Sequence, residues 1–298
     1  MKIQRKFIPG SKWLYFKVYT GYKVADIILE KNISNIIKKL KKESIIDKWF
    51  FIRYNDPDFH LRIRLLLKET NSIGRVINFF YSQLKYLEKD SLIWKIQIDT
   101  YNRELERYGH EMIELAESIF YYDSESLLPI ISKLRLLPNQ NYRWMIALRI
   151  IDEFLSDFLF GIVDKQKIMK DLSDSFKVEF GFNKYNSKQF NSKFRENKKE
   201  IESLLNGINH NPDFNFLTDL LKKRSKSFRP IVLLIKENIK PSTINLNSLI
   251  SSYIHMTLNR LFRSKNRLHE LVIYDFMYRY YTSEIAKLKI QQSNEDLS

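Results

Sequence analysis

The chain has 298 residues, 44% of them hydrophobic, which is enough for a large core in one or two domains. It has no cysteine, which excludes disulfides, thiolate nucleophiles and cysteine-ligated zinc. The formal charge is +15, and residues 183–240 carry 13 Lys/Arg against 6 Asp/Glu. No glycine-rich RNA motif, zinc finger or compact basic tail accompanies this charge, so we expect an acidic peptide or protein partner and no direct need for nucleic acid.

The N-terminal third predicts a small sheet. Residues 11–19 alternate apolar and polar side chains as a half-buried strand does. Residues 22–44 predict two short helices. Residues 49–65 predict a hairpin around the turn Asn55-Asp56-Pro57-Asp58. A helix is expected over about 71–88 and a further strand over 93–100.

From about residue 102 onward the pattern is helical. Breaks are expected near Pro129, Pro138, Gly161, 181–186, 207–212 and 240–243. The sequence therefore predicts an α+β fold, with a small N-terminal antiparallel sheet and hairpin followed by a predominantly helical C-terminal two-thirds.

We expect a single domain over 1–298. Its sheet-containing part covers about 1–100, its helical part about 101–285, and a frayed tail 286–298. The opening residues are too short and polar for a signal peptide, and no run of about 18 apolar residues could span a membrane. A cytoplasmic protein is expected.

The hairpin carries the first group of candidate functional residues. In a strand, His60, Arg62 and Arg64 point to one face while the intervening apolar residues point to the other. Two arginines and a histidine on an apolar-backed strand suggest a preorganised anion site. A surface strand with an electropositive face is the alternative.

A second group follows the strand at 93–100. On a helix, Glu104 and Arg107 share a face at i, i+3, as do Arg103 and Glu106. Ordinary surface salt bridges, which contribute little to stability, are the simpler interpretation. Location favours a binding role, because ligand groups concentrate in loops that leave strands.

The third group lies near the end of the chain. Ser251, His255 and Asn259 stack at i, i+4 and i+8 on a helix that is otherwise apolar. A hydrogen-bonded core histidine is the alternative to a catalytic one. The five histidines show no metal-ligand spacing, so no metal is expected; they are His60, His110, His210, His255 and His269.

Four stretches together resemble the C-terminal elimination domain of class I lantibiotic dehydratases, also known as the thiopeptide-type bacteriocin biosynthesis domain. They occur in the family's order, between Lys12 and about Tyr281, and read SKWLYFKVYTG, FFIRYNDPDFHLRIR, DTYNRELERYG and SSYIHMTLNRLF. The large glutamylation domain that precedes this domain in full-length dehydratases is not in the sequence. The chain thus resembles a free-standing form.

The resemblance implies a lyase that removes glutamate from glutamylated Ser or Thr of a ribosomal precursor peptide, leaving dehydroalanine or dehydrobutyrine. It implies that Arg64 and Arg107 hold the glutamyl group and that His255 transfers the proton. Further substrate-binding candidates in the same stretches are Arg53, His60, Arg62, Tyr101, Arg103, Glu104, Ser251 and Asn259.

The resemblance also implies the partners. They are the precursor peptide, a separate glutamylation protein that uses glutamyl-tRNA, and a lanthionine cyclase; a homodimer is compatible with the sequence. No cofactor is implied. Two alternatives stay open: a free-standing enzyme of thiopeptide pathways that forms a pyridine by a formal [4+2] cycloaddition, and a non-catalytic peptide-binding subunit of a modification complex.

One reaction requires groups from all three stretches to converge. We therefore predict that Arg64, Arg107 and His255 line one solvent-open, positively charged cleft that admits an extended peptide.

Overall fold

The computed structural model describes residues 3–137, 139, 142–207, 211–240, 242 and 244–295. The chain forms two compact units, each built from two segments. Unit 1 is Met1–Pro138 with Lys226–Ser264, and unit 2 is Asn139–Ser225 with Lys265–Ser298. His210 lies outside the described residues.

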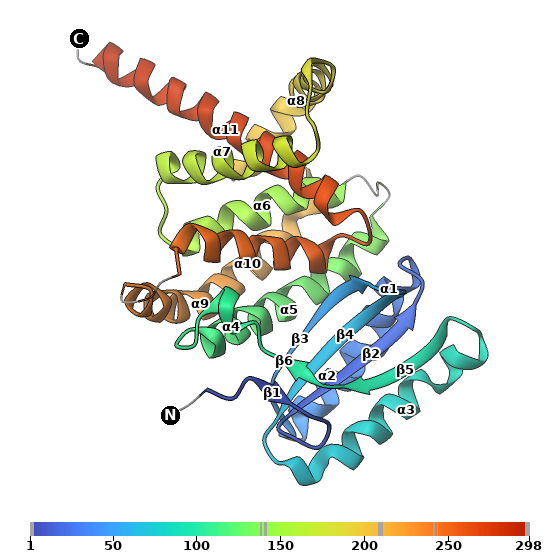
Figure 1. The fold of residues 1–298 in the computed structure, drawn as a ribbon. Coiled ribbons are helices and arrows are strands. Elements are labelled where there is room, and N and C mark those ends of the chain that lie inside the picture. Colours follow the sequence, from blue (N-terminus) through green and yellow to red (C-terminus); the bar gives the residue numbers. More distant parts are fainter. Residues whose placement is uncertain are drawn as a thin grey trace. The chain divides into compact units, whose positions relative to one another are not determined.

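Unit 1 contains a four-stranded antiparallel sheet in the order β3-β4-β2-β5 (Figure 1). Its strands are β2 (Trp13–Thr20), β3 (Ile46–Asn55), β4 (Phe59–Leu67) and β5 (Ile93–Asp99). The predicted strands and the hairpin are confirmed, and β3 and β4 are joined by residues 56–58. The α+β class is confirmed as well.

Helices cover the apolar face of this sheet. α1 (Val24–Ile27), a π-helical stretch (Ile28–Ile33) and α2 (Ser34–Lys42) form one run without a break, and α3 (Ile73–Lys89) follows the 3-10 turn Thr70–Ser72. Apolar residues of α2 recur at helical spacing and join the strand residues in one core. In it, Phe16 of β2 stacks on Phe80 of α3 with ring centroids 3.9 Å apart.

The remaining elements of unit 1 pack near β3 and the other sheet face. They are the two-stranded sheet of β1 (Lys6–Phe7) and β6 (Tyr101–Asn102), with α4 (Leu105–Tyr108), α5 (Ile113–Leu136) and α10 (Leu246–Leu261). α9 (Asn215–Asn238) begins in the segment assigned to unit 2 and ends in that of unit 1. The break expected near Pro129 is wrong. Pro129 lies inside α5, where buried Leu127 and Ile130 on either side stabilise the helix against the lost hydrogen bond.

Unit 2 is helical in its described part, with α6 (Tyr142–Asp157), α7 (Ile162–Glu179), α8 (Lys184–Leu205), the 3-10 turn Pro212–Phe214 and α11 (Asn266–Glu295). The breaks at Gly161 and at 181–186 are confirmed. Those expected near Pro138, 207–212 and 240–243 fall partly outside the described residues.

The frayed tail expected over 286–298 is wrong as far as Glu295. α11 continues to that residue, and Lys287 pairs with Glu284 and with Glu202 of α8 at 2.6 and 2.8 Å. Residues 296–298 lie outside the described part. Among the helices that the structure describes, none is long and apolar enough to cross a membrane.

Candidate functional site

The alternation of β4 divides its residues between two environments. Leu61, Ile63 and Leu65 lie in the core beneath the helices, and His60, Arg62 and Arg64 occupy the opposite face. Arg64 pairs with Tyr15 on one neighbouring strand and with Phe50 on the other. The central strand position of Arg64 is therefore fixed on both sides.

Arg64 is enclosed by aromatic rings. Its guanidinium carbon lies 4.9 Å from the ring centroid of Tyr15, 5.2 Å from that of Phe50 and 4.6 Å from that of Tyr101. The residue is only 9% exposed, yet its side chain makes no hydrogen bond or ion pair with any residue in the described part of the chain. Cation–π contacts stabilise a guanidinium but do not replace the hydrogen bonds of its N–H groups. A buried arginine without a carboxylate partner is suited to bind an anion supplied from outside.

Other buried polar atoms without hydrogen-bond partners lie around the same residue. They are the Trp13 indole nitrogen and the hydroxyls of Tyr15 and Tyr108, in addition to Nε of Arg64. The Trp13 ring contacts Phe50 and Tyr101, which also flank Arg64. Indole and guanidinium N–H groups can only donate, and a phenol donates readily. A ligand that satisfied this cluster would have to supply acceptors, as a carboxylate or an ester does.

Tyr108 connects this cluster with the second group of predicted residues. Its ring contacts Phe120, whose ring in turn contacts Phe50, and it stacks on Tyr253 of α10. Burial raises the pKa of the Tyr108 hydroxyl to about 12, against the lowering effect of the nearby Arg107, Arg260 and Arg64 charges. Both candidate arginines therefore lie within electrostatic range of one protonated phenol.

Arg107 lies next to Tyr108 at the end of the short helix α4. Gly109 ends this helix with φ +79°, and a β-carbon there would lie 2.9 Å from Cε of Met112 and 3.1 Å from Cδ1 of Ile244. Only glycine fits this conformation and this space. Gly109 therefore sets the direction in which the chain leaves α4, directly after Arg107 and Tyr108.

α10 presents the third group. Ser251, His255 and Asn259 are partly exposed while most of their neighbours are buried, as the i, i+4, i+8 spacing predicts. Nε of Arg107 donates to the hydroxyl of Ser252 at 3.1 Å. Ser252 lies three positions before His255, so Arg107 contacts the helix that carries the histidine, close to its position. A chain of contacts thus leads from Arg64, through the rings of Phe50, Phe120 and Tyr108, to Arg107 and α10.

His60 and Arg62 form a positioning pair beside Arg64. The Nδ1 atom of His60 lies 2.8 Å from the Asp58 carbonyl, and Nε of Arg62 donates to Nε2 of His60 at 3.1 Å. Because arginine can only donate, Nε2 must be the unprotonated nitrogen of a neutral ring. Burial lowers the pKa of His60, which keeps this ring neutral. His60 therefore orients Arg62, whose guanidinium stacks on Tyr54 at 3.4 Å from the ring centroid.

Two of the predicted substrate-binding arginines instead form buried ion pairs. Arg53 pairs with Asp26 at 2.6 Å, and both side chains are sealed from solvent. Arg103 binds Glu117 through two hydrogen bonds of 2.7 Å, and the Tyr101 hydroxyl donates to the same carboxylate. The partners are far away in the sequence, so spacing could not reveal them. These ion pairs hold Arg53 of β3 and Arg103, which directly follows β6, in place; a role of either in substrate binding stays a prediction.

The salt bridges expected after the strand are partly confirmed. Nη1 of Arg107 lies 3.3 Å from Glu104, as the i, i+3 spacing predicted. The pair expected between Arg103 and Glu106 is wrong, because α4 begins only at Leu105 and Arg103 is not on the helix. Glu106 pairs with Arg5 instead.

Asn259 has a structural role that the sequence did not indicate. Its side-chain oxygen accepts from the Arg53 backbone N–H at 2.9 Å, and its amide donates to the Arg53 carbonyl at 2.8 Å. Arg260 donates from Nε to the Phe51 carbonyl at 2.8 Å. The C-terminal half of α10 is thus fixed to the outer edge of β3, at positions one and three residues after Phe50, which pairs with Arg64.

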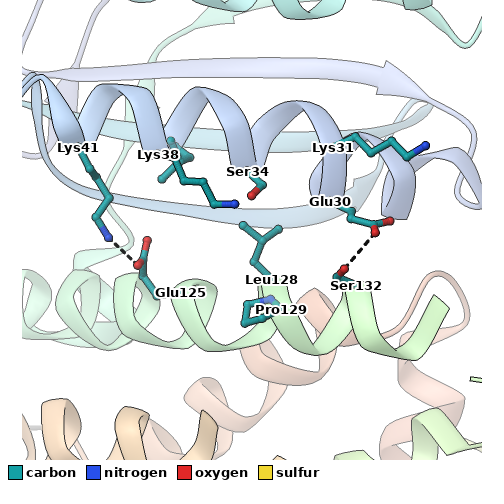
Figure 2. Close-up of a pocket in the computed structure, with 10 residues that line it drawn as sticks. Glu30, Lys31, Ser34, Lys38, Lys41, Glu125, Leu128, Pro129 and Ser132 are labelled. Atoms are coloured by element: carbon teal, nitrogen blue, oxygen red, sulfur yellow. Dashed lines mark hydrogen bonds and ion pairs between the residues drawn. The ribbon is translucent and has the colours of Figure 1, made fainter. Parts of the chain in front are cut away.

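A pocket of about 660 Å³ lies elsewhere in unit 1, between α2 and α5 (Figure 2). Three of its charged residues are already engaged. Glu30 accepts from Ser132, and Lys41 pairs with Glu125 at 2.6 Å. None of the predicted site residues lines it. The candidate site is therefore the arginine-bearing face of the sheet. In the described part of the chain, no three His, Asp or Glu side chains are grouped as metal ligands.

The fold agrees with that of several solved proteins. The tRNA-dependent lantibiotic dehydratase MibB from Microbispora sp. 107891 superposes with a TM-score of 0.73 at 18% identity, covering 94% of this chain and 29% of MibB. The pyridine synthase TbtD from thiomuracin biosynthesis superposes with a TM-score of 0.68 at 10% identity, covering 92% of this chain and 98% of TbtD.

The sequence gives the family. Residues 13–281 match the model of the lantibiotic biosynthesis dehydratase C-terminal domain, and the chain belongs to this family. The subtilin biosynthesis protein SpaB of Bacillus subtilis is 24% identical over 294 residues, covering 94% of this chain. The chain spans 26% of SpaB's length.

Proposed function

We propose that this protein eliminates glutamate from glutamylated Ser or Thr side chains of a ribosomal precursor peptide. The observation that carries the proposal is Arg64, a residue that is 9% exposed and whose guanidinium has no carboxylate partner among the residues that the structure describes. A glutamyl ester would supply that carboxylate. The similarity of the sequence to dehydratase C-terminal domains supports the same reaction.

Arg64 and Arg107 have different roles in this proposal. Arg64 is rigid, held between aromatic rings, and suits the bidentate grip of a carboxylate. Arg107 is 41% exposed and is held by Ser252 and Glu104 through contacts of 3.1 and 3.3 Å. Arg107 can therefore turn from Glu104 towards an incoming glutamyl group.

The elimination needs a base, an enolate-stabilising donor and a stabilised leaving group. A base takes the Cα proton, its electron pair forms the Cα=Cβ bond, and the Cβ–O bond breaks to release glutamate as a carboxylate. His255, partly exposed on α10, is the proton-transfer group in this scheme. The Tyr108 hydroxyl, protonated because its pKa is about 12, donates to the developing enolate oxygen.

On this proposal a separate glutamylation protein uses glutamyl-tRNA in the cytoplasm and delivers the glutamylated peptide, and this chain needs no tRNA itself. Pyridine formation by [4+2] cycloaddition is the second candidate, favoured by the structural similarity to TbtD over 98% of that chain. That reaction has no glutamate to bind, which leaves the buried, unpaired Arg64 without a ligand.

Mass spectrometry of a pre-glutamylated precursor peptide incubated with the purified protein tests the proposal. We expect loss of glutamate without added glutamyl-tRNA. Ring formation from a dehydrated peptide would favour cycloaddition. Binding without chemical change would indicate a non-catalytic subunit.

A further inference from the structure

The two edge strands of the four-stranded sheet, β3 and β5, differ in whether their outward backbone groups are hydrogen-bonded. On β3, side chains satisfy the outward backbone groups: Phe51 N–H donates to the Ser124 hydroxyl, its carbonyl accepts from Arg260, and Asn259 binds both polar groups of Arg53. On β5, no strand pairs with the outer side in the part of the chain described. Among the described residues, no side chain bonds to the backbone of residues 94–98 either. β5 is thus an open edge (Figure 1).

Apolar side chains gather beside this open edge. Trp94 and Ile96 of β5 are 54% and 42% exposed, and Tyr81 and Tyr86 of the neighbouring α3 are also exposed. Tyr81, Tyr86 and Ile96 line a pocket of about 470 Å³ between the two elements. An open edge with an adjacent aromatic pocket is what strand addition by an extended peptide requires, because the edge binds the backbone and the pocket binds alternate side chains.

The opposite face of β5 is basic. Lys95 lies beside Tyr19, and Gln97 beside Lys17, which is in turn opposite Arg62 on β4. The Lys95 ammonium lies 5.1 Å from the Tyr19 ring centroid and, within the described residues, has no carboxylate partner. Asp99, paired with Lys17, is the one acid among the residues of β5. Alternate side chains of a strand added here would face lysine and arginine on one side and the aromatic pocket on the other.

We propose that β5 docks an extended peptide in which acidic and apolar side chains alternate. The peptide adds as a fifth strand, its apolar side chains over Ile96 and Tyr81 and its acidic ones beside Lys95. A second copy of this chain is a poor occupant, because each copy carries a formal charge of +15. This docking surface does not depend on the elimination activity. Only the identity of the docked peptide, as a segment of the precursor, rests on the proposed function.

The docked segment and the processed residue must be different parts of the peptide. Strands are about 4.8 Å apart, so an added strand lies roughly 14 Å from β4, which carries Arg64. At about 3.3 Å per residue, roughly four or five residues span that distance. Docking at β5 would thus anchor the peptide while a nearby Ser or Thr reaches the arginine.

A synthetic heptapeptide that alternates glutamate and valine is the probe. Trp94 is the exposed tryptophan, so its fluorescence should shift to shorter wavelength when the probe covers it. A peptide with lysine in place of glutamate should bind more weakly, by about tenfold or more, because its lysines meet Lys95 with like charge.

Backbone methylation separates strand addition from simple adhesion. Two probes are N-methylated at alternate residues, one at odd and one at even positions. In an added strand only one set of N–H groups faces β5, so one methylated probe should lose binding and the other should keep it. Equal binding of both, or no binding of the unmodified probe, overturns the proposal.

Ile96→Gln tests the location, with Leu234→Gln as a matched control. Leu234 of α9 is 46% exposed and lies outside the proposed surface. We expect Ile96→Gln to weaken the probe about tenfold and Leu234→Gln to leave it unchanged. A dimer in sedimentation that Ile96→Gln dissociates would assign the edge to a second copy and overturn the proposal.

Elimination assays separate this proposal from the proposed function. A short glutamylated peptide without a docking segment should lose glutamate equally in Ile96→Gln and the parent. Probe binding without any elimination by the parent would leave the docking surface in place and refute the elimination activity. If the parent and Ile96→Gln eliminate glutamate from a full precursor at the same rate and no probe binds, the docking surface is refuted and the elimination activity stands.

Discussion

At the scale of single residues, Arg64 shows how a side chain can be prepared for a ligand. Tyr15, Phe50 and Tyr101 surround the guanidinium and bury its Nε atom, and they supply only ring contacts in return. The free protein therefore holds a cation whose hydrogen bonds are not all made. A bound carboxylate would accept the missing hydrogen bonds in a site of low dielectric, where a charge-assisted hydrogen bond is strong.

Replacing Arg64 should separate activity from stability. A hydrogen bond to a charged group contributes about 1.5–3 kcal/mol, so Arg64→Ala should slow elimination about tenfold to a hundredfold or more and let glutamylated peptide accumulate. Arg64→Lys should not restore the rate, since an ammonium lacks the planar fork. Mass spectrometry of the product checks this, with the exposed Arg75→Ala as control. Dehydration by Arg64→Ala at the parental rate would remove the arginine from the site.

Tyr108→Phe should lower activity without lowering stability. The hydroxyl is buried with no partner, so removing it relieves an unsatisfied donor and should leave the melting temperature equal or higher. Elimination should slow because the enolate loses a donor. Tyr281→Phe is the converse control: its hydroxyl donates to Asp152 at 2.8 Å, so stability should fall by about 1 kcal/mol with elimination unchanged. A parental rate for Tyr108→Phe would exclude the phenol from the reaction.

His60 should make stability depend on pH. Its folded-state pKa is lowered by burial, so below the ordinary value of about 6.5 the unfolded chain binds more protons than the folded one. Stability should therefore fall as the pH drops through that value. Urea unfolding at about pH 7.5 and about pH 5.5 should show a smaller loss for His60→Gln than for the parent. The remaining slope comes partly from His269, whose pKa burial also lowers. An identical loss in both proteins would contradict the neutral ring.

The sequence predicted those site residues whose role follows from local periodicity, and it missed those whose partners are distant along the chain. The period of two in β4 indicated Arg62 and Arg64, and the period of 3.6 in α10 indicated His255. The roles of Arg53 and Arg103 were missed because Asp26 and Glu117 reach them only in the folded chain. Tyr108 and Trp13 were missed because an aromatic residue in a sequence gives no sign of whether its polar atom will find a partner.

At the scale of elements, the contact between α10 and β3 determines where the histidine-bearing helix lies. The Asn259 side chain bonds to both the backbone N–H and the carbonyl of Arg53, as a residue of a neighbouring strand would. Long, periodic elements such as α3 and β5 were predicted well because their burial pattern repeats several times. β1 and β6, with two residues each, contain too few positions for any pattern.

Asn259→Leu should loosen this attachment. Leaving the Arg53 backbone groups unpaired should cost about 1–3 kcal/mol and speed hydrogen exchange at the Arg53 amide. Elimination should slow as α10 shifts. Asn238→Leu, which removes a similar but exposed bond within α9, is the control. If Asn259 instead binds substrate, as the sequence suggested, the variant will raise KM and leave stability and exchange unchanged.

At the scale of the whole molecule, the chain alternates between its two units. It passes from unit 1 to unit 2, returns with residues 226–264, and ends in unit 2. Neither unit is a continuous segment that could be completed first. We therefore propose that 1–298 is one domain in the folding sense.

Calorimetry tests this proposal. We expect one thermal transition with equal calorimetric and van't Hoff enthalpies, because each unit needs both of its segments. The two units should also unfold at the same urea concentration, followed by Trp49 in unit 1 and Trp144 in unit 2 in single-tryptophan variants. Two separate transitions would instead define two domains.

The alternation also has a consequence during synthesis. The ribosome completes Arg64 and Arg107 long before it reaches α10, and the 148 positions between Arg107 and His255 take roughly 7 to 30 seconds at about 5–20 residues per second. Throughout that interval the nascent chain carries β3 without the side chains that bind its edge, together with aromatic residues that α10 will later cover. A growing chain in this state offers an unpaired strand to other nascent chains. Its yield in a cell should therefore depend on chaperones that act at the ribosome, more than on the stability of the finished protein.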